Sequence, residues 1–437
     1  MAEAPAIGRC GPPGYRQCTS EQFARVVKHR KNQQPFRTWQ SEPWGSFRYH
    51  SAGAHRPLLD HTSARCLIAN SHSQWGEDRV LLLLLLGLPT SHHTFVEIGA
   101  FNGIDYSNTI ALERCFRWRG LLVEANPGSW ERLQRNRCGD KASKNACVHS
   151  GVCRPAGNMS VTPWEQEISG SMDDMSEAHL NRWGRWNRVL DQRSHVTVPC
   201  APLSSLVHDA ALPHVGFLSI DVEGAEYRVL QSTNLAAVDI VMVEADGLNP
   251  LKDAYVQREL LLNGFSPLPL HARGSQLYHA RDLQLRMGCE MSASRSARGE
   301  DMMLLPSLLA IPLSARGAGV ERNGTFVEEA QNPLTSIVEA CFDWRPATAQ
   351  DSRVDLLSVY APRLESVSQQ RPLHRYSMIA VQGSESELHE AGRLLTNGST
   401  LFRPSEPFVL YRRLAMADTA VYCRPGLLRR RELADIK

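Results

Sequence analysis

Between about residues 66 and 279, short and nearly continuous apolar runs alternate with amphipathic stretches. Such runs are typical of strands buried on both faces of a parallel sheet. They are TFVEI (94–98), GLLVE (120–124), ACVHSGV (146–152), VGFLSI (215–220) and DIVMVEA (239–245). The stretches between them have helical spacing and a polar face, most clearly at 107–118, 127–137 and 224–234. The alternation predicts a doubly wound α/β sheet with helices on both faces.

The most apolar run of the chain is VLLLLLLGLP, at Val80 to Pro89. It has only about half the length that a membrane-spanning helix needs. We therefore interpret it as a buried helix or strand of the core, and we predict no membrane span.

Two regions depart from the alternation. Residues 1–64 are rich in arginine, proline, histidine and aromatic residues, without a period of two or of 3.6. We interpret them as an irregular basic arm, which could contact RNA or a membrane surface but is better explained by packing on the main domain. Residues 154–193 are polar and contain Trp164, Trp183 and Trp186. This segment fits either a lid over the sheet edge or a packed elaboration without ligand contact.

Blocks of the first half recur, in the same order, in the second half, and this predicts an internal duplication. The matching blocks begin with CLIANSHSQWGED at Cys66 and CEMSASRSARGED at Cys289, followed by TFVE at 94–97 and 325–328, ERCFRWR at 113–119 and EACFDWR at 339–345, GFLSIDVEGAE at 216–226 and DLLSVYAPRLE at 355–365, and ELLLNGFSPL at 259–268 and GRLLTNGSTL at 392–401.

The second copy has lost residues where chemistry would be expected. It lacks the glycine loop that follows TFVE, and it carries Tyr360, Pro362 and Arg363 in place of an aspartate, a glutamate and a glycine. We therefore predict an arm at 1–64, an active domain at 65–285 and a degenerate, smaller α/β repeat at 286–437.

The stretch VEIGAFNG indicates a strand followed by a tight turn with Gly99 and Gly103. Glycine at such a turn lets a ligand approach the main chain closely. Glu97 precedes the loop, and Glu124 ends the next strand, where an acid is placed to bind ribose hydroxyls. This pattern predicts a site for an adenosine-containing cofactor. The third glycine of the dinucleotide fingerprint is missing, and an acid near the loop suits the positive groups of S-adenosylmethionine.

Two more acids, Asp221 and Glu223, follow the apolar run at 215–220. Carboxylates beside a bound cofactor could accept a proton from an acceptor hydroxyl. Together with Glu244 they could instead hold a divalent cation that lowers the pKa of that hydroxyl. A structural alternative is that one of them caps the following helix or pairs with Arg228.

These motifs resemble the FkbM family of class I S-adenosylmethionine-dependent methyltransferases. The resemblance covers roughly residues 66–279 and is most specific in EIGAFNG…SNT and SIDVEGAE. It implies a seven-stranded, mostly parallel Rossmann-like sheet and methyl transfer to an oxygen, often of a sugar. The residues that it places at the methionine-binding loop are Glu97, Gly99, Ala100 and Gly103, and it places Glu124 at the ribose and Asp221 and Glu223 at the catalytic position. We add Ser150 as a cofactor contact near the adenine edge.

Two other classes of function are less consistent with this sequence. A nicotinamide-dependent oxidoreductase would need the third glycine of the dinucleotide-binding fingerprint, which the loop after 94–98 lacks. A non-catalytic scaffold built from methyltransferase-like repeats would not need the acids at Glu124, Asp221 and Glu223, which the first copy retains.

Composition narrows the choice of partners and compartment. The chain has 437 residues, 42% of them hydrophobic, and a net charge of +2, so no specific nucleic-acid partner is predicted. Its 11 cysteines include no C-x-x-C pair, and we expect most of them to be small buried residues in a reducing compartment. Three N-x-S/T triplets, at Asn158, Asn323 and Asn397, arise easily by chance. A cytoplasmic enzyme acting on a small molecule or glycan is the resulting expectation, without a prediction of oligomeric state.

Overall fold

The computed structural model describes most of residues 57–286, with short gaps, and the strand at 48–50. Beyond residue 286 it describes isolated elements, at 325–329, 345–346, 354–360, 376–382, 385–396, 409–413 and 419–423, and the single residues 305 and 364. Among the described residues, no helix is both long and apolar enough to cross a membrane.

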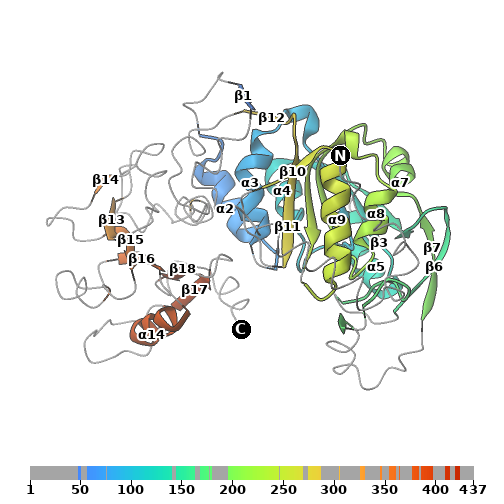
Figure 1. Cartoon of the computed structure of the whole chain (residues 1–437). Helices are drawn as coiled ribbons and strands as arrows, with labels where there is room; N and C mark the ends of the chain where they lie inside the picture. Colours follow the sequence, from blue (N-terminus) through green and yellow to red (C-terminus); the bar gives the residue numbers. More distant parts are fainter. Residues whose placement is uncertain are drawn as a thin grey trace, which may run out of the picture.

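A seven-stranded sheet forms the centre of the first half, as predicted (Figure 1). Its strand order is β10-β11-β9-β8-β2-β3-β4, and every strand is parallel to its neighbours except β11, which runs antiparallel to β9 and β10. The strands are β2 (Thr94–Ile98), β3 (Arg119–Glu124), β4 (Ala146–His149), β8 (Val215–Ile220), β9 (Val238–Glu244), β10 (Phe265–Pro267) and β11 (Ser275–Ala280). This is a Rossmann-like α/β fold.

Alternate side chains of each central strand enter two separate cores. Phe95 of β2 packs with helices α2 (His61–Asn70), α3 (Glu77–Gly87) and α4 (Ile110–Phe116), while its neighbour Val96 packs on the other face with α7 (Leu203–Asp209), α8 (Glu226–Gln231) and α9 (Pro250–Leu262). Helix α5 (Pro127–Leu133) contributes Leu133 to the first core and continues as a π-helical turn, η3 (Gln134–Cys138). Because both faces are covered, the strands read as continuous apolar runs.

The predicted strand at 146–152 is divided in the structure. After β4 the chain leaves the large sheet at Ser150, and β5 (Gly151–Val152) joins a small sheet of order β5-β7-β6. The other two strands of this sheet are β6 (Gly157–Val161) and β7 (Val196–Ala201). The two short strands are half-buried and buried respectively, with only Ser150 between them, so the sequence pattern does not reveal the change of sheet.

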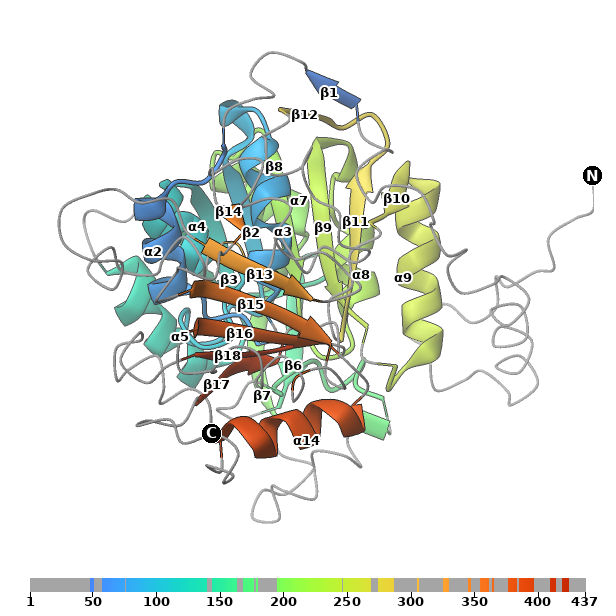
Figure 2. The same cartoon turned by 90° about the vertical axis from the view of Figure 1, so that its left-hand side faces the viewer.

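The leucine run forms the helix α3 and has no solvent-facing side. From Leu81 to Leu86 no side chain is more than 6% exposed. These leucines belong to one core with Phe217 of the large sheet and with Leu356 and Ala380 of the second half. Figure 2 shows the strands of the second half lying across this side of the first domain, which explains why the helix is apolar on every face.

The described part of the second half contains a six-stranded sheet of order β14-β13-β15-β16-β18-β17. Its elements are β13 (Thr325–Glu329), β14 (Arg345–Pro346), β15 (Val354–Tyr360), β16 (Tyr376–Gln382), the helix α14 (Glu385–Thr396), β17 (Val409–Arg413) and β18 (Thr419–Cys423). The repeated sequence blocks align β14, β13 and β15 with β3, β2 and β8, and these three strands are adjacent in the same order in both sheets.

The strand registers of the two sheets also correspond. Thr94 lies opposite Arg119 in the first sheet, and Thr325 lies opposite Arg345 in the second. Likewise, Phe95 faces Phe217, and their sequence counterparts Phe326 and Leu356 face each other. Since the blocks were matched on sequence alone, this agreement supports the duplication hypothesis. The duplication and its boundaries at 65–285 and 286–437 stay predictions.

The expected N-terminal arm falls mostly outside the described residues. Its described parts are the strand β1 (Arg48–His50), which pairs in parallel with β12 (Gln284–Arg286), and residues 57–64, which include the beginning of α2 at His61. The region assigned to the arm therefore already contributes a helix to the main domain.

The cysteines described between residues 57 and 286 form disulfides, and this corrects the expectation from sequence. Three disulfides join Cys66 of α2 to Cys115 of α4, Cys138 of η3 to Cys147 of β4, and Cys153 after β5 to Cys200 of β7. Every cysteine within the described residues 57–286 is paired. The pairs link different elements, so no short spacing motif could reveal them.

Candidate cofactor and acceptor site

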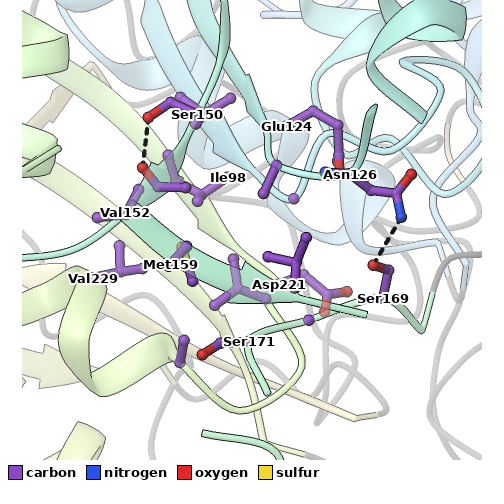
Figure 3. Close-up of a pocket in the computed structure, with 18 of the residues that line it drawn as sticks. Ile98, Glu124, Asn126, Ser150, Val152, Met159, Ser169, Ser171, Asp221 and Val229 are labelled. Atoms are coloured by element: carbon purple, nitrogen blue, oxygen red, sulfur yellow. Dashed lines mark hydrogen bonds between the residues drawn. The ribbon is translucent and has the colours of Figure 1, made fainter. Parts of the chain in front are cut away.

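A cavity opens at the carboxyl ends of β2, β3 and β8, where open α/β sheets bind ligands (Figure 3). It holds about 620 Å³ of space continuous with solvent. Its lining includes the apolar side chains of Ile98, Val123, Val152, Met159, Val161 and Val229, and the polar side chains of Glu124, Asn126, Ser150, Ser169, Ser171 and Asp221.

Gly99 lies at the point where two loops of the cavity meet. Its φ of 78° is in the left-handed region, and a Cβ there would collide with the backbone carbonyl of Asp221. The amides of Gly99 and Ala100 both donate to the carbonyl of Val123, at 3.0 and 3.1 Å. Glycine is therefore required for the loop after β2 to pass between the ends of β3 and β8.

The carboxylate of Glu124 lies at the end of β3 and lines the cavity. One oxygen accepts the amide of Phe101 at 2.8 Å, and the other accepts the amide of Asn126 at 2.7 Å. Burial raises the pKa of Glu124 to about 7, against the lowering effect of these amides. Each oxygen keeps a lone pair for a further donor, so the group can accept two hydroxyls of a ribose.

Glu97, predicted to bind the cofactor, lies behind the loop and does not line the cavity. Its carboxylate accepts the hydroxyls of Ser107 and Thr109 at 3.0 and 2.6 Å and the amide of Asn108 at 2.8 Å. The guanidinium of Arg137 lies 3.3 Å away, and both side chains are almost fully buried. In this structure Glu97 fixes the glycine loop to the start of α4.

Ala100 and Gly103 also lie outside the cavity lining. Ala100 is buried in the core beneath the loop. A Cβ on Gly103 would lie 2.6 Å from a methyl carbon of Leu133 and 3.0 Å from Arg137, so this glycine allows the loop to pack on α5 and η3. Of the predicted cofactor residues, Gly99, Glu124 and Ser150 line the cavity.

Asn126, which was not predicted, lines the cavity together with part of the segment 168–176, for which a lid over the sheet edge was one of two predicted alternatives. Asn126 accepts the amides of Gly128 and Ser129 at the start of α5, and its Nδ2 donates to the hydroxyl of Ser169 at 3.2 Å (Figure 3). The amide of Thr162 donates to the carbonyl of Gly170, which ties the segment to the end of β6. This part of the tryptophan-bearing segment therefore forms a wall of the cavity; its tryptophans lie outside the described residues.

Three carboxylates gather beside the cavity, at the ends of β8 and β9. Asp221 lines the cavity, and one oxygen from each of Asp221, Glu223 and Glu244 lies within 4.8 Å of the others. Burial, together with the charges of Glu223 and Asp221, raises the pKa of Glu244 well above its ordinary value. The cluster therefore retains a proton more readily than three separate carboxylates would.

A buried ion pair holds the loop that presents these acids. Glu226 accepts the amides of Val222 and Gly224, at 3.2 and 3.0 Å, and its other oxygen lies 2.9 Å from the ammonium of Lys252. Burial alone would raise the pKa of Glu226, but Lys252 and the Gly224 amide outweigh it and hold the pKa below its ordinary value. Glu226, which sequence reasoning did not select, thus caps the loop from within.

Glu223 has its own buried partner. Its backbone has a φ of 55°, which is uncommon for a residue with a side chain, and its carboxylate lies 3.2 Å from Nδ1 of His179. Arg228 was the alternative partner suggested for Asp221 or Glu223. In the structure it pairs with Asp174 instead, with its Nε 2.8 Å from the carboxylate. No sequence signal pointed to His179, because the contact depends on how 168–179 folds over the sheet edge.

The residues present fit an adenosine-containing cofactor. The paired oxygens of Glu124 suit a ribose, and the apolar side of the cavity, with Val152 and Met159, suits an adenine ring. A Rossmann-like sheet with an acid at the end of its second parallel strand and a glycine turn after its first defines the class of nucleoside-cofactor-binding α/β domains.

Comparison with known proteins places the chain within this class. Residues 97–268 match the family model described as Methyltransferase FkbM domain, so this part of the chain is similar to the FkbM methyltransferases. No curated protein matches the chain.

Two solved structures are similar to it at a low level. The crystal structure of methyltransferase FkbM from Methylobacillus flagellatus KT shares 12% identity at a TM-score of 0.29, covering 43% of this chain and 44% of that one. The hMettl16 catalytic domain, solved in complex with the MAT2A 3'UTR hairpin 6, shares 13% identity at a TM-score of 0.23, covering 46% of this chain and 67% of that one. Scores of this size support no conclusion about function.

Proposed function

We propose that the chain is an S-adenosylmethionine-dependent methyltransferase that methylates a hydroxyl oxygen of a sugar or a related small molecule or glycan. The observation that carries the proposal is the placement of Glu124 and Asp221 in one cavity, on either side of the loop at Gly99. The family match at 97–268 supports the reaction class.

In this proposal Glu124 binds the ribose hydroxyls, the Gly99 turn lets the main chain approach the cofactor, and Ser150 lies near the adenine. When bound, S-adenosylmethionine supplies a methyl group that is activated by a sulfonium. The residues of the chain position the acceptor and accept its proton, and positioning supplies a large share of the rate.

The proton of the acceptor hydroxyl goes to the cluster of Asp221, Glu223 and Glu244. Three carboxylates that share protons at close range include one with a raised pKa, which is a better base near neutral pH than an ordinary carboxylate. Several carboxylate oxygens also offer acceptors to neighbouring hydroxyls, which favours a polyhydroxylated acceptor.

The first test is titration calorimetry of the full-length protein with S-adenosylmethionine and, for comparison, NADH. We expect the protein to bind S-adenosylmethionine and not to bind NADH. A wild-type protein that binds NADH, or neither compound, would overturn the proposal.

The second test separates binding from chemistry with Asp221→Asn. We expect the Kd for the cofactor to change little and kcat to fall by about 10²- to 10⁴-fold, the usual contribution of a general base. Transfer from methyl-labelled cofactor to fractions of a cell extract measures turnover and identifies the acceptor fraction. Asp209→Asn, on an exposed helix end, is the matched control. Unchanged turnover in Asp221→Asn would remove Asp221 from the catalytic position.

A metal-dependent version of the reaction predicts a different outcome. If the three carboxylates held a divalent cation, EDTA would abolish turnover and added Mg²⁺ would restore it. The proposed proton transfer predicts that turnover is insensitive to EDTA.

A further inference from the structure

The disulfides of the first half form a consistent set. They join α2 to α4, η3 to β4, and the end of β5 to β7, with Cα–Cα separations of 5.6, 6.1 and 5.5 Å. Such separations are typical of disulfides that form without backbone movement. A domain in which every described cysteine is paired is typical of oxidising compartments and is rare in a reducing cytosol.

A second, independent feature lies on the small sheet. Asn158-Met159-Ser160 is an N-glycosylation triplet without proline, and it lies on β6, an edge strand of the three-stranded sheet. Met159 and Val161 line the cavity, so Asn158 and Ser160, which alternate with them, lie on the opposite face of the strand. Asn158 is exposed.

The face of β6 that carries Asn158 and Ser160 is therefore separate from the cavity. Asn158 lies opposite Pro199 of β7, and Cys200, which is bonded to Cys153, lies opposite Gly157. The strand that would carry a glycan is thus fixed by a disulfide, and a sugar chain on its outer face leaves the cavity open.

We propose that this protein matures in an oxidising, glycan-adding compartment and that Asn158 carries an N-linked glycan. The inference does not depend on the methyltransferase proposal, and it replaces the expectation of a reducing, cytoplasmic environment. The three sequence triplets alone did not support it, because the disulfides are visible only in the structure.

Both covalent steps have defined co-reactants. Nδ2 of Asn158 forms a bond to C1 of a sugar on a lipid-linked oligosaccharide diphosphate; the C1–O bond to phosphate breaks, the diphosphate leaves with the electron pair, and the amide loses one proton to solvent. Each disulfide forms by exchange with a disulfide-bearing oxidoreductase, which takes up the two electrons and two protons of the cysteine pair.

The test uses full-length protein recovered from the cells that produce it, with free thiols blocked by N-ethylmaleimide at lysis. Peptide mapping without reduction should recover the Cys66–Cys115, Cys138–Cys147 and Cys153–Cys200 peptides as linked pairs. Treatment with peptide N-glycosidase in heavy-oxygen water should convert Asn158 to labelled aspartate. Blocked thiols at these six cysteines, or an unmodified Asn158, would overturn the proposal.

A matched pair of variants guards against misfolding as an explanation. Ser160→Ala removes the acceptor triplet, and Ser160→Thr retains it, with both changes at one partly exposed position. We expect the modification at Asn158 to be lost in Ser160→Ala and kept in Ser160→Thr, with all three disulfides present in both. Equal occupancy of Asn158 in the two variants would contradict an N-linked glycan there.

Discussion

At the scale of single residues, Glu124 links cofactor binding to pH. Because burial raises the pKa of Glu124 to about 7, its carboxylate is partly protonated at neutral pH. Ribose hydroxyls donate to the ionised form, so cofactor affinity should increase as pH rises through about 7 and then level off.

Glu124→Gln should remove this pH dependence and weaken binding roughly 10- to 100-fold, since a hydrogen bond to a charged group contributes about 1.5–3 kcal/mol. Calorimetry between pH 6 and 8.5 measures both effects. Glu131→Gln, on the exposed side of α5, is the control and should behave as wild type. An affinity of the wild type that is flat across this range would contradict the role of the carboxylate.

A second prediction concerns the ion pair beneath the acidic loop. Lys252→Met leaves the buried carboxylate of Glu226 without its partner and should lower the free energy of unfolding by about 3–5 kcal/mol, measured by urea denaturation. The pKa of Glu226 is lowered in the folded state, so its contribution is present above the ordinary pKa of glutamate and is lost as pH falls through the lowered value. The deficit of Lys252→Met should therefore shrink in acid.

The double variant Lys252→Met, Glu226→Gln supplies the control. Removing both charges should recover part of the lost stability, because Glu226 no longer carries a buried charge, although Asp253 and Glu244 still lose the ammonium that lies 3.7 and 3.9 Å from them. A double variant less stable than Lys252→Met would indicate that the loop needs the carboxylate more than it needs charge balance.

A site residue could be predicted from the sequence where its role follows from its position along a strand. Glu124 and Asp221 end buried strands, and the ends of parallel strands meet at one edge, so sequence placed them in the same cavity. Glu97 also lies near the end of a strand, one residue before Ile98, but its carboxylate faces Arg137, a residue far along the chain. Contacts of that kind arise from tertiary folding and leave no local pattern.

At the scale of elements, the glycine turn after β2 sets the distance between two loops. Gly99→Ala would place a methyl group against the backbone carbonyl of Asp221 and force a side chain into the left-handed region. We expect a loss of about 1–3 kcal/mol from backbone strain alone and a weaker affinity for the cofactor, both measurable on purified protein.

Gly157→Ala is the matched control for this turn. Position 157 has open space around its Cβ, so alanine should be tolerated. Equal stability and affinity in the two variants would show that the loops can separate without cost.

The strands themselves followed from the sequence more completely than their sheet membership. The strands β2 and β8 have the predicted bounds, because both faces are buried and the apolar runs end where the chain reaches the site. The run at 146–152 was predicted as one strand, yet it serves two sheets. A continuous apolar pattern records burial and not the identity of the neighbouring strand.

At the scale of the whole molecule, we propose that residues 65–285 are the active domain and 286–437 a repeat without the site. The duplication hypothesis makes a covalent prediction. The matched blocks align Cys289 with Cys66 and Cys341 with Cys115. In the first half, Cys66 and Cys115 are joined by a disulfide. Cys289 and Cys341 lie outside the described residues, and the hypothesis predicts that they are linked as well.

Peptide mapping without reduction checks this prediction. A linked Cys289–Cys341 peptide is expected, and its loss in Cys289→Ser should leave the Cys66–Cys115 link intact as an internal control. Pairing of Cys289 with any other cysteine would contradict the proposed equivalence of the two halves.

If the second half is a repeat that has lost its acids, the helix α3 gives a reason for its retention. The leucines of α3 share one core with Leu356 and Ala380, so the first half would expose an apolar surface if the second half were deleted. Selection for solubility alone would then retain the repeat. Under such selection, drift should be slow on the side of β15 and β16 that covers the helix and fast at their carboxyl ends, where Tyr360 already replaces an aspartate. Under the duplication hypothesis, a repeat without catalytic residues would still be needed to cover this helix.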